Sequence, residues 1–451
     1  MRSSFRRGLG ALVCLAVAAV APMGCGGGGT ISGADTGSTP QALSARSSSN
    51  GSDAFTPFGT VTVAQGIQVN DPANPQEPQG PVASRLAGGG AALAWVSGSS
   101  LVAQQIDSSG HNVGPQQAIA TLAGPVWAYA VGGLNGGDWV VAWADLTLPQ
   151  LDQTPHGQPY TIQTKRFDAR GALVGDTTLV VPGISYSAVD SHLQVRAMPD
   201  GGYVVAFSAA PGSPQMFATY QRFADDGTAV GAPVFVAGSG ENQSRLQVVP
   251  LPNRSIVAVW EQQSTSATGT SYSLYTRHFD AEGNPVTPPT QITAAVHDAP
   301  FEVAATLLQG QKIGIAWTQP AIPAVSISGM SWQIMDKSGR TIATGTPIQQ
   351  RGLDGIDVAP SDKGFTVFYQ VFSETARGGI SQLNALQIDH KGSELGTTSV
   401  VNRQIWLAPS SGGPAGPAST GFAVAGGSDG HYVAAFESAI AGGAEVNALG
   451  Q

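Results

Sequence analysis

A short turn motif recurs along most of this 451-residue chain and limits the possible folds more than any other feature of the sequence. The motif is a hydrophobic residue, aspartate, two variable residues and glycine. It reads I-D-S-S-G, F-D-A-R-G, F-D-A-E-G, M-D-K-S-G and I-D-H-K-G, with F-A-D-D-G as a shifted sixth copy. Steps of 61, 56, 56, 56 and 53 residues separate Gly110, Gly171, Gly227, Gly283, Gly339 and Gly392. Such regular spacing indicates a protein built from structural repeats.

The composition of the motif suits a type I turn that closes a β-hairpin. The aspartate accepts hydrogen bonds from local backbone N–H groups, and the glycine adopts the positive φ that the exit from such a turn needs. A calcium site is the alternative interpretation. A calcium loop supplies several carboxylate or carbonyl ligands at close spacing, whereas each copy here offers one aspartate. We therefore interpret the copies as structural turns and expect neither a metal ion nor a cofactor.

A second repeated element is a short apolar run that ends in an aromatic residue. The seven runs end at Trp95, Trp143, Phe207, Trp260, Trp317, Tyr369 and Phe436. Their continuous apolar character predicts strands that are buried on both faces. The third unit, for example, divides into strands at about 193–198, 203–208, 216–223 and 229–236. Because four-stranded units repeated radially are propeller blades, we expect an all-β fold, a seven-bladed β-propeller of four-stranded antiparallel blades.

The last unit ends after three strands, at N-A-L-G-Q, and its missing fourth strand has a candidate near the other end of the chain. Residues 60–70 resemble the fourth strand of the other units, for example residues 396–402. We expect this N-terminal strand to complete the last blade and close the ring, because closure removes an open sheet edge.

The N-terminus has the features of a bacterial export signal. Three arginines precede an apolar run over residues 11–23, which is too short to cross a bilayer as a helix. The run leads into M-G-C, which resembles a bacterial lipobox, although Pro22 stands where that family prefers leucine. The resemblance implies that residues 1–24 are a lipoprotein signal peptide and that Cys25 becomes the lipidated first residue. An uncleaved short anchor or an ordinary secreted protein is the alternative.

The segment after the cysteine differs in composition from the rest of the chain. Residues 25–54 are mostly glycine, serine, threonine and alanine, which predicts a flexible tether, and residues 55–451 form the repeat domain. Cys14 leaves with the leader, so the mature domain has no thiol or disulfide chemistry. Gly26 replaces the aspartate associated with inner-membrane retention. We expect an exported protein anchored to the bacterial outer membrane or cell surface through its lipid alone.

Composition and motif searches exclude several function classes. A net charge of -9 disfavours binding to nucleic acid, because an acidic surface repels phosphate backbones. The chain contains no serine nucleophile elbow, no H-E-x-x-H and no phosphate-binding glycine loop. None of the seven histidines has a histidine two or four residues away, which excludes a local zinc pair. We expect a monomer.

Two stretches resemble the tandem units of large bacterial surface and secreted proteins, which have the form V-A-W…Q-R-F-D-x-x-G-x-x-V-G. They are K-R-F-D-A-R-G-A-L-V-G from Lys165 and Y-Q-R-F-A-D-D-G-T-A-V-G from Tyr220. The resemblance covers about residues 55–451. It implies a propeller-like repeat architecture and assigns no site residues.

The expected topology singles out one face of the ring as the working face. Short turns lie on one side, and long, divergent loops lie on the other, where function usually resides on a rigid scaffold. The candidate ligand-binding residues on this long-loop face are Trp127, Tyr186, His192, Arg245, His297, Asp298, Asp354 and Trp406.

Alignment of the innermost strands identifies a row of polar residues. The aligned positions hold Gln194, Gln247, Glu302 and Asp357. Glu302 and Asp357 are therefore the catalytic candidates, as a carboxylate pair facing the channel. The alternative is a structural role, in which these side chains bond neighbouring backbone inside the ring.

Two functions remain open. We expect a membrane-anchored binding or scaffold protein for a glycan, peptide or protein ligand, and the sequence favours this over an enzyme. The alternative is a polysaccharide-active hydrolase or lyase that uses the carboxylate pair near the channel. A deep pocket lined by Glu302, Asp357 and a histidine, with raised carboxylate pKa values, would favour the enzyme. A shallow, aromatic-lined loop face would favour binding.

Overall fold

The computed structural model is composed of β-strands joined by turns, with a short 3₁₀ helix at Gln309–Gln311. The described residues are 11–20, 42–43, 61–63, 67–68, 78–97, 99–122, 128–146, 160–181, 188–190, 192–211, 215–238, 240–267, 269–297, 301–322, 327–345, 348–351, 353–375, 378–406, 422–426 and 431–439. No helix among them is long and apolar enough to cross a bilayer. The all-β prediction is confirmed.

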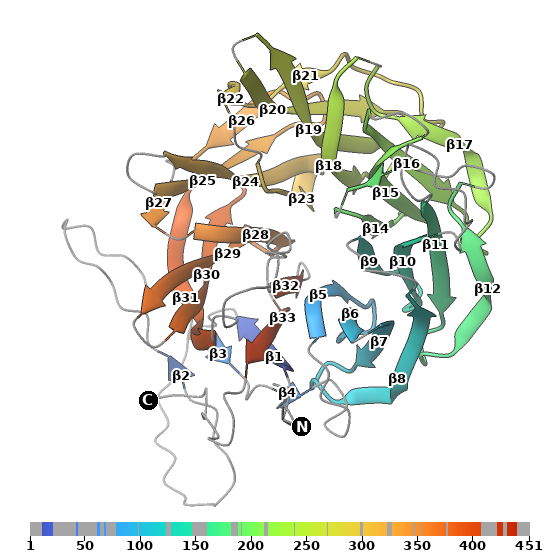
Figure 1. Ribbon diagram of the computed structural model, residues 1–451, viewed down its shortest axis with the longest axis vertical. Helices are drawn as coiled ribbons and strands as arrows, with labels where there is room; N and C mark the ends of the chain where they lie inside the picture. Colours follow the sequence, from blue (N-terminus) through green and yellow to red (C-terminus); the bar gives the residue numbers. More distant parts are fainter. Residues whose placement is uncertain are drawn as a thin grey trace, which may run out of the picture.

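Over these residues, the strands form seven antiparallel sheets that surround a central axis (Figure 1). From the axis outward, the first sheet contains β5 (Pro78–Arg85), β6 (Ala91–Ser97), β7 (Ser100–Ile106) and β8 (Asn112–Thr121). The second contains β9 (Tyr129–Gly133), β10 (Trp139–Leu146), β11 (Tyr160–Phe167) and β12 (Leu173–Leu179). Both of these sheets are meanders, as expected of a propeller blade.

The third sheet closely matches the strands expected from the sequence. It contains β14 (Gln194–Ala197), β15 (Tyr203–Ala210), β16 (Phe217–Phe223) and β17 (Ala229–Phe235), with β13 (Ala188–Val189) also paired to β15. The fourth contains β18 (Asn242–Pro250), β19 (Ile256–Ser266), β20 (Gly269–Phe279), β21 (Thr290–Gln291) and β22 (Val296–His297).

The fifth and sixth sheets continue the same order. The fifth contains β23 (Val303–Leu308), β24 (Lys312–Ile322), β25 (Ile327–Met335), β26 (Thr341–Thr344) and β27 (Ile348–Arg351). The sixth contains β28 (Leu353–Pro360), β29 (Gly364–Thr375), β30 (Gly378–Asp389) and β31 (Glu394–Trp406).

The hydrophobic core lies between neighbouring sheets. Every residue of β15 is buried, as the continuous apolar run predicted. One cluster joins Val140 and Ala142 of β10 to Val205 and Phe207 of β15, and similar clusters join the other neighbouring sheets. Each sheet therefore needs a neighbour on both sides to bury its two faces, which favours a radial arrangement.

The recurrent turns have the geometry that their composition predicted. Asp168 Oδ1 accepts hydrogen bonds from the backbone N–H groups of Arg170 at 2.9 Å and Ala172 at 2.8 Å. Gly171 has a φ of +79°. The same two bonds recur at Asp107, Asp280, Asp336 and Asp389. The repeated aspartates therefore cap their own turns.

The seventh sheet differs from the expected one. Its inner strands are β32 (Phe422–Gly426) and β33 (His431–Ala439), and β33 pairs along its other edge with β1 (Ala11–Val20). The short strands β3 (Val61–Val63) and β4 (Ile67–Gln68) pair with β1, and β2 (Ala42–Leu43) pairs with β3.

Residues 61–63 and 67–68 of the expected closing strand thus lie on the outer side of the seventh sheet. Residues 11–20 of the expected signal peptide form its third strand, counted from the axis. Residues 447–451, at which the three expected strands of the last unit end, lie outside the described residues. The physical reason is that an apolar run rich in valine and leucine readily pairs with an otherwise open strand edge.

Replacing Gly171 by valine should lower the free energy of unfolding by about 1–3 kcal/mol, because a β-branched residue disfavours a positive φ. Asp168→Ala should lower it by about 1 kcal/mol through the loss of the turn hydrogen bonds. Urea unfolding measures both values. Thr178→Val, on the exposed strand β12, is the control and should change stability little. A Gly171 variant as stable as this control would contradict the turn geometry.

Candidate functional site

The innermost strand of each sheet lies beside the central axis and has one edge without a strand partner (Figure 1). Backbone N–H groups on such an edge need another acceptor when they are buried. Side chains of the preceding sheet supply such acceptors. For example, Gly133 N donates to Ser84 Oγ at 2.8 Å, Val248 N to Gln194 Oε1 at 2.7 Å, and Val424 N to Asp357 Oδ2 at 2.9 Å. Polar side chains near the axis therefore connect one sheet to the next.

Five charged side chains meet near the N-terminal ends of the innermost strands of the third, fourth and fifth sheets. This charge cluster consists of Asp190, His192, Arg245, Glu261 and Glu302. His192 Nδ1 lies 3.1 Å from Asp190 Oδ1, and His192 Nε2 lies 3.0 Å from Glu302 Oε2. Arg245 Nη1 bonds the other oxygen of Glu302, and Arg245 Nε lies 3.7 Å from Glu261 Oε1. The short turns at the far ends of these strands place the cluster at the long-loop end of the channel.

The cluster favours the charged forms of Asp190, His192 and Glu302. Burial alone would lower the pKa of His192, but the carboxylates of Asp190 and Glu302 outweigh it and raise that pKa from 6.5 to about 10. Burial alone would raise the pKa of Glu302, but His192 and Arg245 lower it from 4.5 to about 2. The pKa of Asp190 likewise falls well below its usual range, against the effect of burial, through His192 and Arg245. At neutral pH the contacts of His192 with Asp190 and Glu302, and of Arg245 with Glu302, are therefore ion pairs.

Carboxylates of the charge cluster also accept hydrogen bonds from backbone N–H groups at the inner edges of the fourth and fifth sheets. The N–H of Arg245 donates to Asp190 Oδ2 at 2.6 Å, and the N–H of Phe301 donates to Glu261 Oε2 at 2.6 Å. Arg245 has a φ of +55°, which is uncommon outside glycine, and it lies at a register shift in β18. The contacts from Asp190 and Glu302 hold it there. Burial raises the pKa of Glu261, although Arg245 opposes this shift.

The structure brings together some of the residues that the sequence singled out. His192 and Arg245 both contact Glu302, across three sheets. Asp190 and Glu261 were not among the residues that the sequence singled out. A signal for Glu261 was present, because it directly follows Trp260. Five of the other six runs have an uncharged residue at this position, and the last run has another glutamate, Glu437.

The other candidates on the long-loop face are not brought into the charge cluster. Trp127, Tyr186 and Asp298 lie outside the described residues. His297 is exposed on β22, where it pairs with Ser271 of β20. Asp354 pairs with Gln370 within the sixth sheet, and Trp406 ends the outer strand β31 opposite Gly379.

The strand register corrects the alignment of Glu302 with the polar row. Gln194, Gln247 and Asp357 each pair with the residue that precedes the aromatic of the second strand, and in β23 that position belongs to Ala304. Glu302 lies two residues nearer the long-loop end. Because residues two apart share one face of a strand, alternation alone could not detect this shift. The expected equivalence of Glu302 and Asp357 is wrong.

Asp357 belongs to a different set of contacts from Glu302. Its Oδ1 accepts from Val358 N at 2.8 Å, and its Oδ2 accepts from Val424 N on β32. Burial raises the pKa of Asp357, although the two backbone bonds and the charge of Arg196 oppose this shift. Across the described ranges, no three histidine, cysteine or acidic side chains are placed to hold a metal ion.

No family model and no curated protein matches this chain. Similar solved structures include the Trypanosoma rangeli sialidase in complex with the inhibitor DANA, at a TM-score of 0.39 and 11% identity over 73% of this chain and 55% of that chain. A thermostable family-43 glycoside hydrolase has a TM-score of 0.38 and 9% identity over 64% and 97%. The Dos1 propeller has a TM-score of 0.37 and 10% identity over 76% and 75%. The chain spans little more than half of the sialidase, and similarity at this level assigns neither a family nor an activity.

Replacing His192 by glutamine should destabilise the protein by about 1–3 kcal/mol near pH 5.5. Breaking a buried ion pair costs about 3–5 kcal/mol, and the partial exposure of these side chains reduces that value. Because folding raises the pKa of His192, its stabilisation is complete below pH 6.5 and disappears as the pH rises through about 10. Because folding lowers the pKa of Glu302, the contribution of Glu302 declines as the pH falls below 4.5.

The difference in unfolding free energy between wild type and His192→Gln should therefore be largest between pH 4.5 and 6.5. Urea unfolding over pH 4–10 measures it. His111→Gln, at a histidine with 76% side-chain exposure, is the matched control. A difference that stays constant from pH 5 to pH 10 would contradict the ion pairing.

Proposed function

We propose that the protein is an exported, lipid-anchored β-propeller that binds a ligand on its long-loop face. The observation that carries this proposal is the pairing of charges in the charge cluster. A glycoside hydrolase needs a carboxylic acid whose raised pKa keeps it protonated near the substrate. Glu302 has a lowered pKa instead, and both of its oxygens contact cations. The cluster therefore supports a rigid binding platform better than acid–base catalysis.

The charge cluster is suited to ligand recognition because it fixes the ends of the innermost strands of three neighbouring sheets. Asp190 lies just before β14, Arg245 lies in β18, and Glu302 immediately precedes β23. Loops that start from fixed points can present different side chains without disturbing the core. A glycan, a peptide or a partner protein is the class of ligand that such a face accommodates.

A polysaccharide hydrolase is the second candidate function. It is favoured by the raised pKa of Glu261, which is buried on β19, and of Asp357, which is half-buried on the innermost strand β28. Against this function, both carboxylate oxygens of Asp357 and one of Glu261 accept hydrogen bonds from backbone N–H groups.

A paired assay on the detergent-solubilised full-length protein distinguishes the two functions. Binding is measured on glycan and peptide arrays, and release of reducing ends is measured on the same polysaccharides. We expect saturable binding without product release. Turnover by the wild type that is lost in Asp357→Asn or Glu261→Gln would establish the hydrolase instead. Absence of binding to every class would also contradict the proposal.

The membrane anchor in this proposal depends on the leader sequence. Cys25→Ser should move the protein from the membrane fraction to the soluble fraction, because lipid attachment needs the thiol. Membrane fractionation followed by immunoblotting measures the distribution, with Cys14→Ser as the control that should remain membrane-bound. A Cys25 variant that sediments with membranes at the wild-type level would disprove lipidation.

We further propose that the mature ring has seven blades and that residues 60–70 close it. Removal of the leader takes β1 away from the edge of β33. The sequence E-V-N-A-L at residues 445–449 matches Q-L-N-A-L at residues 382–386 in β30, the third strand of the sixth sheet. The C-terminal segment is therefore our candidate for the third strand of the mature seventh blade, with residues 60–70 outside it.

Deletion of residues 55–72 should expose a strand edge and cause aggregation or a large loss of melting temperature. Deletion of residues 27–50 is the control and should change stability little, because a solvated tether contributes no core. Differential scanning calorimetry and size-exclusion chromatography of the processed protein measure both effects. A 55–72 deletion variant as stable and monomeric as the parent would contradict closure by this segment.

A further inference from the structure

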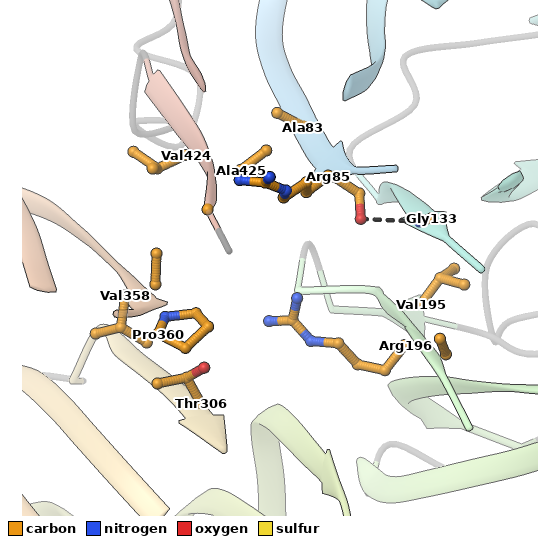
Figure 2. A pocket seen from close by; sticks show the side chains of 14 residues that line it. Ala83, Arg85, Gly133, Val195, Arg196, Thr306, Val358, Pro360, Val424 and Ala425 are labelled. Atoms are coloured by element: carbon orange, nitrogen blue, oxygen red, sulfur yellow. Dashed lines mark hydrogen bonds between the residues drawn. The ribbon is translucent and has the colours of Figure 1, made fainter. Parts of the chain in front are cut away.

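A cavity lies beside the central axis at the end opposite the charge cluster, where the short turns of the inner hairpins lie. Its volume is about 180 Å³, and its lining comes from the ends of β5, β9, β14, β23, β28 and β32. Six sheets therefore contribute to one space. Figure 2 shows the side chains of Arg85 and Arg196 entering it from different strands.

The charged side chains in the lining are all cationic. Arg85 and Arg196 are present, and no aspartate or glutamate lines the cavity. The guanidinium of Arg196 extends into the open space across from Pro360 (Figure 2). Among the described residues it has neither a hydrogen-bond partner nor an ion pair. By contrast, Arg166 pairs with Asp138 at 2.6 Å.

The nearest compensating charge for Arg196 is already engaged. Asp357 is the carboxylate whose charge acts on Arg196, but both of its oxygens accept backbone N–H groups. Burial lowers the pKa of Arg196, which reports the unfavourable desolvation of its charge. A guanidinium in this position gains strongly from an anion that takes up its free donors.

The lining of the cavity offers further polar contacts. Most of its exposed surface is polar, although the side chains of Ala83, Val195, Val358, Pro360 and Ala425 are apolar. Thr306 adds a hydroxyl donor. The planar fork of a guanidinium matches the two oxygens of a carboxylate or of a phosphate or sulfate group.

We propose that this cavity is an anion-binding site in which Arg196, together with Arg85, holds a small oxyanion such as a carboxylate, phosphate or sulfate group. The site lies at the opposite end of the channel from the proposed ligand-binding face. It does not depend on the function proposed for that face, and loss of one should leave the other intact.

Thermal melts and isothermal titration calorimetry of the detergent-solubilised full-length protein test the site. The probes are sodium phosphate, sulfate, acetate and glucuronate, titrated at constant ionic strength against chloride. We expect at least one probe to give a saturable rise in melting temperature. Phosphate or sulfate alone would identify a tetrahedral anion, and acetate or glucuronate alone would identify a carboxylate, and either result supports the site.

Substitutions locate the binding. Arg196→Gln should weaken binding at least tenfold, and Arg196→Lys should weaken it less, because lysine keeps the charge but loses the fork. Arg170→Gln, at an exposed arginine on a turn, is the matched control and should bind as the wild type does. Urea unfolding shows whether each variant is folded. If Arg196→Gln does not fold, the same titration of Arg85→Gln replaces it, with the same expected loss.

Two results would overturn the site. The first is equal binding by wild type and the folded arginine variant. The second is the absence of any saturable response by the wild type at constant ionic strength, since Arg196 would then act only to balance Asp357.

Discussion

The unpaired inner edge of each sheet is the constraint on which the rest of this structure depends. A meandering sheet that points one edge at a central axis leaves backbone N–H groups there without strand partners. In this protein the acceptors are side chains of a neighbouring sheet, at Ser84, Gln194 and Asp357. The hydrophobic clusters between sheets supply most of the burial, and these polar bonds set how neighbouring inner strands are placed.

This constraint explains the chemistry of the channel. Asp190, Glu261 and Asp357 all accept backbone N–H groups. Asp357, which the sequence singled out as a catalytic candidate, therefore has structural partners in the fold. The remaining acid, Glu302, is held by His192 and Arg245. Most carboxylates near the axis thus already have hydrogen-bond or ion-pair partners, which leaves the guanidinium of Arg196 with free donors. The two ends of the channel therefore differ chemically.

Local features of the fold were predictable, and contacts between distant repeats were not. The Asp–Gly turns follow from short-range backbone chemistry, and the strands of the third unit follow from apolar runs between turns. The pairing of His192 with Glu302 joins residues 110 positions apart on different sheets. The displacement of Glu302 by two residues could not be predicted, because the side chains of a strand alternate between its faces with a period of two residues. The pairing of residues 11–20 with β33 was not predicted, because the same apolar pattern also indicates a signal peptide.

Backbone hydrogen exchange tests the central claim, that side chains of one sheet cap the inner-edge amides of the next, most directly. Exchange is followed at the amides of Val424 and Val248 in the wild type, in Asp357→Ala and in Gln194→Ala. The account predicts faster exchange at Val424 in Asp357→Ala alone and faster exchange at Val248 in Gln194→Ala alone. Unchanged exchange at both amides, or an equal increase at both in either variant, would contradict it.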